Sequence, residues 1–298
     1  MSNKLLTMGL PLLLLSMPSF AQSGSNSAAF LDIPIGGRPA ALGGAYSALA
    51  SDAYAPVWNP AGLPRVGRSQ VAATHLFYLQ DMSSDYFSVV VPFKGRHGFG
   101  VSTQFLRSGD IPATDSLGRP IGAVRANYSA FTLAYGLTLN SRWSVGVAPK
   151  AVVASLDHDT AAAYAADAGV SFLATPRLRF GAVVANMGTS LGRDALPAAV
   201  RFGGAYEAFG GILGTAELCH AFSGVTDVRG GVEWTIYPGF SLRVGAHGHG
   251  GEEQWRSFAG GIGFAVLGQE LDYAWVPEGS LGSTHFITLV AGFGKPSP

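Results

Sequence analysis

The sequence predicts an all-β fold, a 14-stranded antiparallel transmembrane β-barrel with an N-terminal plug (hatch) segment inside the lumen. First, the 298-residue chain is 48% hydrophobic and only 13% charged, whereas soluble domains average about 25% charged residues. Second, no apolar run after residue 20 approaches the length of about 20 residues that a spanning helix needs. Third, most of the chain alternates apolar and polar residues. A closed barrel is the remaining structure that satisfies its backbone inside a bilayer.

Residues 1–21 are predicted to form a secretory signal peptide. Lys4 supplies a positive charge, Leu5 to Met17 form the apolar core, and Ser19 and Ala21 provide small residues before the cleavage point. This pattern predicts export and, together with the barrel pattern, a bacterial outer-membrane location. The single Cys219 excludes an intrachain disulfide framework and a cysteine-clustered zinc site.

Residues 22–69 do not alternate and contain short stretches with helix and turn signals. Glycine-rich turns of this length cannot form a core of their own, and a 14-stranded barrel otherwise encloses a water-filled space. We therefore expect residues 22–69 to fill the lumen as a plug, and residues 70–298 to form the barrel. The plug residues that we expect to matter are Arg38, Gly43, Gly44, Asp52, Asn59, Pro60 and Gly62.

The barrel region divides at turn signals into fourteen segments, and bacterial single-chain barrels have an even number of strands. The clearest alternates Phe131 and Leu133 with Thr132 and Ala134. The first is ambiguous, because 71–79 fits either face. The predicted strands are 70–80, 84–94, 97–107, 124–139, 142–155, 161–173, 177–187, 198–208, 212–222, 225–237, 240–249, 254–266, 269–276 and 284–294.

Short and long connections alternate along the predicted barrel. Every second one is a tight turn, such as 94–96, 140–141 and 238–239, while the longest of the others spans 108–123. Outer-membrane barrels have short periplasmic turns and longer outer loops. We therefore expect both ends of the chain on the periplasmic side.

A soluble β-sandwich or β-propeller is the alternative fold, since both have short alternating strands. Such a sheet turns Lys and Glu toward water, whereas the polar face here consists mostly of Gly, Ala, Ser and Thr. This composition favours the membrane barrel. The formal net charge is zero and no charge run is present, so a nucleic-acid partner is not expected.

Sparse charged residues fall on the predicted lumen face. We expect them to form an ion-pair network between wall and plug, because an unpaired buried charge is strongly destabilising. Arg38 and Asp52 are the candidate plug partners for wall charges of opposite sign. The alternative is a polar conduit or a ring that contacts substrate. The predicted network comprises Lys150, Asp167, Arg179, Arg201, Glu217, Arg229, Glu233, Arg243 and Asp272.

No residues predict catalysis, a cofactor or a metal centre. No Ser–His pair recurs at a spacing typical of a nucleophile with its base. The acid–histidine groups at 157–159 and 247–253 are expected to be solvated loops rather than metal sites. Gly-x-Gly strings such as Gly98 and Gly100 lie inside predicted strands, where glycine permits close approach of another backbone. We expect these glycines to admit the plug against the wall.

Residues 35–63, IGGRPAALGGAYSALASDAYAPVWNPAGL, closely resemble the N-terminal signature of the PorV/PorQ (UPF0164-like) family of FadL-like outer-membrane barrels. The tetrapeptide Asn59 to Gly62 is shared with the wider FadL-like group. The resemblance implies a fourteen-stranded barrel with an N-terminal hatch. It also implies two functions, because PorV-type members belong to the type IX secretion system and FadL-type members carry hydrophobic compounds.

The function expected first is a non-enzymatic component of protein secretion or surface attachment, with outer-membrane lipid and secretion-system subunits or secreted proteins as partners. The alternative is a FadL-like channel for hydrophobic small molecules. That channel needs an apolar cavity at the outer mouth and a lateral opening in the wall. The predicted outer loops are short for a FadL-type transporter, so no ligand residues are transferred. A barrel hydrolase is a third, weaker hypothesis.

Overall fold

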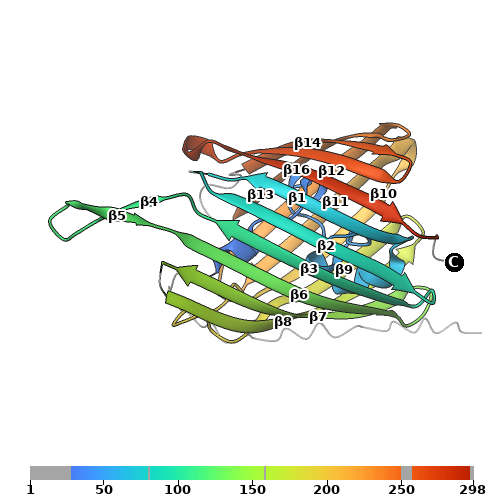
Figure 1. Cartoon of the computed structure of the whole chain (residues 1–298). Coiled ribbons are helices and arrows are strands. Elements are labelled where there is room, and N and C mark those ends of the chain that lie inside the picture. Colours follow the sequence, from blue (N-terminus) through green and yellow to red (C-terminus); the bar gives the residue numbers. More distant parts are fainter. Residues whose placement is uncertain (1–27, 80, 158, 250–256, 296–298) are drawn as a thin grey trace, which may run out of the picture.

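The computed structural model describes residues 28–79, 81–157, 159–249 and 257–295. The predicted signal peptide and the first residues of the predicted plug lie outside this range. Fourteen strands close into an antiparallel barrel in which each strand pairs with its neighbours along the chain, and Ser69 of the first strand pairs with Phe293 of the last (Figure 1). The predicted fourteen-stranded antiparallel barrel is therefore confirmed.

The barrel strands agree closely with the predicted segments. They are β1 (Ser69–Phe77), β2 (Ser83–Phe93), β3 (His97–Arg107), β6 (Ala126–Thr138), β7 (Trp143–Leu156), β8 (Asp159–Thr175), β9 (Leu178–Gly188), β10 (Ala199–Glu207), β11 (Ile212–Ala221), β12 (Thr226–Tyr237), β13 (Phe240–His249), β14 (Ser257–Val266), β15 (Gln269–Pro277) and β16 (Ser283–Phe293). Tight turns join them at one end, here called the short-turn end. The longer connections lie at the other end, here called the loop end.

The connection predicted over 108–123 is the longest in the barrel, and it is not irregular throughout. It contains a hairpin, β4 (Ile111–Thr114) and β5 (Pro120–Val124), which forms a two-stranded sheet apart from the barrel. The hairpin projects beyond the rim in Figure 1. Its turn is organised by Asp115, whose Oδ1 accepts hydrogen bonds from the backbone N–H groups of Leu117 and Arg119, both at 2.9 Å. Local turn chemistry thus builds a hairpin without help from the wall.

Side chains of the wall alternate between two environments, as a period of two requires. Phe131 is 50% exposed on the outer face, while the next residue, Thr132, is 4% exposed on the lumen face. The outer face carries many large exposed apolar side chains, among them Phe99, Leu133 and Trp234. Within the described ranges, no helix is long and apolar enough to cross a bilayer.

Residues 28–66, here called the lumen segment, pack against the inner faces of the strands. The segment contains η1 (Ala29–Asp32), α1 (Gly37–Ala41), α2 (Ala55–Trp58) and η2 (Pro60–Arg65). Helix α1 contacts β13 to β16, and η2 contacts β2, β3 and β6 to β8 on the other side of the barrel. The segment thus reaches across the lumen, where the N-terminal part of the chain appears in blue (Figure 1).

Glycines on the inner face allow the lumen segment to touch the wall. A Cβ atom on Gly245 would lie 2.2 Å from the backbone nitrogen of Gly43, and one on Gly169 would lie 2.1 Å from Oδ1 of Asn59. Any side chain at these positions would collide with the segment. The wall glycines in such contact are Gly98, Gly100, Gly136, Gly146, Gly169, Gly181, Gly203, Gly231, Gly245 and Gly261.

Candidate functional site

The loop-end half of the lumen is lined by apolar side chains. They form two clusters, and the lumen segment contributes Phe30, which is 3% exposed, to one of them and Ile33 to the edge of both. The wall residues come from strand ends and from the loop between β9 and β10, which places them near the opening. This apolar mouth comprises Phe30, Leu76, Leu106, Val152, Leu191, Leu196, Val276 and Phe286.

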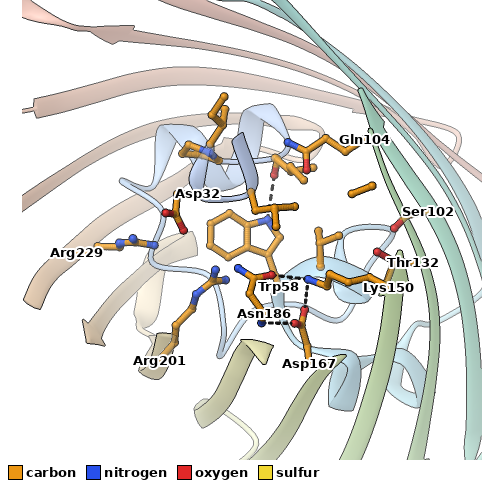
Figure 2. A pocket seen from close by; sticks show the side chains of 16 residues that line it. Asp32, Trp58, Ser102, Gln104, Thr132, Lys150, Asp167, Asn186, Arg201 and Arg229 are labelled. Atoms are coloured by element: carbon orange, nitrogen blue, oxygen red, sulfur yellow. Dashed lines mark hydrogen bonds and ion pairs between the residues drawn. The ribbon is translucent and has the colours of Figure 1, made fainter. Parts of the chain in front are cut away.

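A small polar cavity adjoins the apolar mouth, between the lumen segment and the wall (Figure 2). Its volume is about 30 Å³, enough for about two water molecules. Figure 2 shows the Trp58 ring among the lining side chains, and Trp58 Nε1 donates a 3.0 Å hydrogen bond to the backbone oxygen of Ile35. The polar lining residues are Asp32, Ser102, Gln104, Thr132, Lys150, Asp167, Asn186, Arg201 and Arg229.

Lys150, Asp167 and Asn186 form a buried hydrogen-bonded group on one side of this cavity. Lys150 Nζ donates to Asp167 Oδ2 and to Asn186 Oδ1, each at 2.8 Å, and the Asn186 N–H donates to Asp167 Oδ1 at 2.7 Å. The register of β8 against β9 shifts between Ala166 and Ala168, and Asn186 has a φ of 57°. The bulge aims these three side chains at one another.

Asn186 is a site residue that the sequence analysis missed. The signal was its position in the otherwise apolar run from Phe180 to Met187, since asparagine is depleted in strands and enriched at positive φ. Its Nδ2 also donates to the backbone oxygen of Pro197 at 3.0 Å. Asn186 therefore joins the wall bulge to the loop that carries part of the apolar mouth.

Two arginines face the cavity from the side opposite the lysine group. The Arg201 guanidinium lies 5.4 Å from the centroid of the Trp58 ring, and Arg229 lies 3.8 Å from Glu217 Oε1. Glu217 also accepts a 2.8 Å hydrogen bond from the Ser47 N–H, so it links wall and segment. Enclosure by the barrel raises the pKa of the Asp32 carboxyl, and the charges of the two arginines oppose this rise.

A second charged group fastens the lumen segment by way of Arg38. Arg38 donates from Nε and Nη2 to the two oxygens of Glu233, both at 2.8 Å. Glu233 accepts a further hydrogen bond from Arg243 Nε at 2.6 Å, and Arg243 also pairs with Asp272. A bidentate arginine–carboxylate pair such as Arg38–Glu233 is among the stronger charged contacts in proteins.

Asp52 differs from the expectation that it pairs with a wall charge. Its partners lie in the lumen segment itself: the Tyr46 hydroxyl bonds its carboxylate, and Arg38 Nη1 lies 3.9 Å from Oδ2. The segment folds back on itself between residues 46 and 54, so Asp52 faces Tyr46 rather than the wall. Burial raises the pKa of the Asp52 carboxyl, and Arg38 partly offsets this effect.

The remaining predicted plug residues shape the segment. Asn59 Nδ2 donates to the backbone oxygens of Ser47 and Val170 at 2.9 and 3.1 Å, and its Oδ1 accepts from the Ala61 N–H at 3.1 Å. It therefore caps η2, which begins at Pro60, and joins this helix to the wall. Gly43 and Gly44 have φ values of 66° and 78° and form a tight turn after α1.

Not every predicted network residue joins these groups. Arg179 faces the lumen near the short-turn end, where its Nη2 lies 3.4 Å from Glu207 Oε2, apart from both charged groups. The two acid–histidine loops of the sequence analysis extend to residue 158 and to residues 250–253, which lie outside the described residues.

The model of the uncharacterised protein family UPF0164 matches residues 18–200. The chain belongs to family UPF0164. The match confirms the family that the N-terminal signature resembled. No curated protein matches the sequence of this UPF0164 member.

Three solved structures illustrate the fold that this chain shares. The Ralstonia pickettii toluene transporter TbuX has 16% identity and a TM-score of 0.68, over 87% of this chain and 98% of that chain. The Pseudomonas putida toluene transporter TodX has 12% identity and a TM-score of 0.64, over 85% and 95%. A Pseudomonas aeruginosa FadL homologue has 10% identity and a TM-score of 0.58, over 84% and 96%. The UPF0164 chain thus shares the closed-barrel fold of these three proteins.

Proposed function

We propose that this UPF0164 member is an outer-membrane channel for hydrophobic small molecules. The observation that carries the proposal is the apolar mouth at the loop end, which Phe30 of the lumen segment occupies. The channel hypothesis needs an apolar cavity at the outer mouth, and at this end of the lumen the protein's own Phe30 packs into an apolar cluster.

Phe30 indicates the size of molecule that the mouth accommodates. The phenyl ring and its methylene have the shape of toluene, and the ring packs against Tyr128 with a centroid distance of 5.3 Å. Burying a phenylalanine side chain stabilises by about 1.5–3 kcal/mol. A monoaromatic ligand in its place would bury a similar apolar area. TbuX and TodX, both described as toluene transporters, support this ligand class.

We also propose that the lumen segment closes the barrel at rest. The contacts between Arg38 and Glu233, the glycine contacts of the wall and the small size of the polar cavity support this role. Passage of a ligand through the barrel then requires displacement of the lumen segment, and Phe30, near the N-terminal end of this segment, moves first.

Uptake of radiolabelled toluene by a Gram-negative host that produces the protein tests the proposal. Val152→Trp fills the mouth from β7 and is expected to reduce uptake to the level of cells without the protein. Val147→Trp is the matched control, because Val147 lies on the same strand but faces outward. Phe30→Ala empties the mouth and is expected to raise uptake.

Heat-modifiable migration on gels verifies that each variant folds. Uptake that is equal with and without the protein contradicts the channel. Uptake that Val152→Trp and Val147→Trp affect alike contradicts the assignment of the mouth.

The projecting hairpin favours a second candidate function, the secretion component that the family resemblance implied. Ile111 is 49% and Leu117 is 75% exposed, so the hairpin presents apolar side chains beyond the rim. Affinity purification of the tagged protein from outer membranes tests this candidate. Recovery of secretion subunits with the full chain, but not with a variant that lacks residues 111–124, supports it.

A further inference from the structure

Three charged or titratable side chains, here called the rim cluster, face outward at the loop end of the wall. His75 Nδ1 lies 2.7 Å from Asp85 Oδ1, and Arg107 Nη1 lies 2.8 Å from Asp85 Oδ2. They come from three neighbouring strands, β1, β2 and β3. The residues next to them in sequence, Leu76, Tyr86 and Leu106, are buried on the lumen side. The alternation therefore places the rim cluster on the outer surface.

An ionised group on the outer face of a barrel is destabilising at the bilayer midplane and tolerated near the interface. The rim cluster lies within the last residues of β1 and β3 at the loop end, which corresponds to the outer-leaflet boundary. Asp85 holds the other two side chains in place but does not use all of their donors. Arg107 is 57% and His75 is 41% exposed, and a guanidinium carries five N–H donors.

A depression in the outer wall, here called the wall groove, begins directly beside the rim cluster. One row of paired residues crosses it and alternates large and small side chains: Leu289, Ala73, Phe87, Thr103, Phe131, Ala151 and Tyr164. The groove has a volume of about 920 Å³ and an apolar lining. Its strands form the near face of the barrel in Figure 1.

The rim cluster and the wall groove adjoin along the strands. Ala73 precedes His75 by two residues, and Phe87 follows Asp85 by two residues on the antiparallel neighbour. Two residues along a strand span about 7 Å. The apolar wall groove thus ends beside a group of hydrogen-bond donors near the loop end of the wall.

We propose that the wall groove and the rim cluster together bind a phosphate-bearing lipid of the outer leaflet. One acyl chain lies in the groove over Ala73, and the phosphate accepts hydrogen bonds from Arg107 and His75. Arginine matches the geometry of phosphate oxygens with paired N–H donors. Asp85 orients Arg107 and His75 but uses only part of their hydrogen-bonding capacity, so the remaining N–H donors of Arg107 are available to the phosphate. The site lies outside the wall and does not depend on the channel proposed for the lumen.

Native mass spectrometry of the full chain in detergent tests this site with two probes. Dioleoylphosphatidylglycerol carries one anionic phosphate, and dioleoylglycerol has the same chains without it. We expect the phosphatidylglycerol to remain bound with a stoichiometry of one and to be preferred over dioleoylglycerol. Arg107→Gln is expected to weaken phosphatidylglycerol binding about tenfold, as loss of a charge-assisted hydrogen bond predicts.

Two control variants show whether an effect on lipid binding is specific to the rim cluster or follows from the loss of any exposed arginine or histidine. Arg125 is also exposed and paired with an aspartate, and His220 also faces outward at the loop end of its strand. Arg125→Gln and His220→Gln are expected to bind like the unchanged protein. Ala73→Phe fills the groove and is expected to weaken binding of both probes.

Equal binding of the two probes, no bound phosphatidylglycerol, or binding that Arg107→Gln and Arg125→Gln affect alike would overturn the proposal. Gel migration with and without heating verifies that each variant remains folded.

Discussion

Gly62 shows how a single residue determines the fit of the lumen segment. A Cβ atom at this position would lie 1.5 Å from the backbone oxygen of Ala50, so the segment cannot keep its course if the residue has a side chain. Gly67, five residues later, has no atom within 4 Å of the corresponding position. The two glycines therefore form a matched pair for experiment.

We expect Gly62→Ala to lower the free energy of unfolding by about 3 kcal/mol, the upper end of the range for forcing a methyl group into a packed core. Gly67→Ala should leave it unchanged. Urea titration in detergent micelles, followed by tryptophan fluorescence, measures both. A Gly62→Ala protein as stable as the Gly67→Ala protein would show that the segment is not packed in this way.

Asp52 gives the lumen segment a dependence on pH. Burial raises the pKa of its carboxyl above the ordinary value of 3.8, despite the opposing charge of Arg38. Between the ordinary and the raised pKa, the folded protein binds more protons than the unfolded chain. The free energy of unfolding therefore falls as pH rises through this window.

Asp52→Asn removes this titration. Melting temperatures measured from about pH 4 to about pH 8 should show the unchanged protein losing stability relative to Asp52→Asn as pH rises, because only the former loses a proton there. Two parallel curves would show only a constant loss of stability from the missing contacts with Arg38 and Tyr46, and would contradict the raised pKa. A relative gain in stability by the unchanged protein as pH rises would also contradict it.

At the scale of elements, each strand of the wall has one face toward the lumen segment and one face toward the outside of the barrel. Gly245 on β13 faces the lumen segment, and its Cβ position lies 2.2 Å from the backbone of Gly43. Gly214 on β11 faces outward with open space around it. Glycine thus permits close backbone packing at Gly245, whereas at Gly214 it only leaves the outer surface without a side chain.

Gly245→Ala is expected to push the turn at Gly43 away from the wall and to raise single-channel conductance in planar bilayers. Gly214→Ala, the matched control, should conduct like the unchanged protein. Equal conductance of the two variants would mean that contact at this strand does not hold the segment.

At the scale of the whole molecule, the lumen segment bridges opposite sides of a closed wall. Its contacts run from β2 and β3 around to β16, and the charged contact between Arg38 and Glu233 ties it to β12. A barrel of this width without such a segment contains a water-filled channel. The segment and the wall are therefore expected to function as one unit.

Deletion of residues 23–62 should raise single-channel conductance several-fold in planar bilayers, because water and ions then fill the lumen. Gel migration verifies that the barrel still closes. Unchanged conductance in a folded barrel would refute the role of the segment as a plug.

The sequence by itself determined the number of barrel strands, most of their bounds and the alternation of their faces. These properties depend on local signals: a period of two, turn residues and the length needed to cross a bilayer. The strand predicted over 97–107 is β3 (His97–Arg107) in the structure. The resemblance of residues 35–63 likewise identified the family, because a contiguous motif needs no tertiary information.

Only the tertiary structure decided which side chains meet. The first strand was ambiguous by pattern, and closure against β16 turned Leu76 inward and His75 outward. That register placed His75 opposite Asp85, so the two side chains meet in the rim cluster. The bulge that joins Asp167 to Asn186 and the inward fold of Asp52 likewise depend on contacts between distant segments. Register around a closed barrel is set by all strands together, so no single stretch of sequence encodes these pairings.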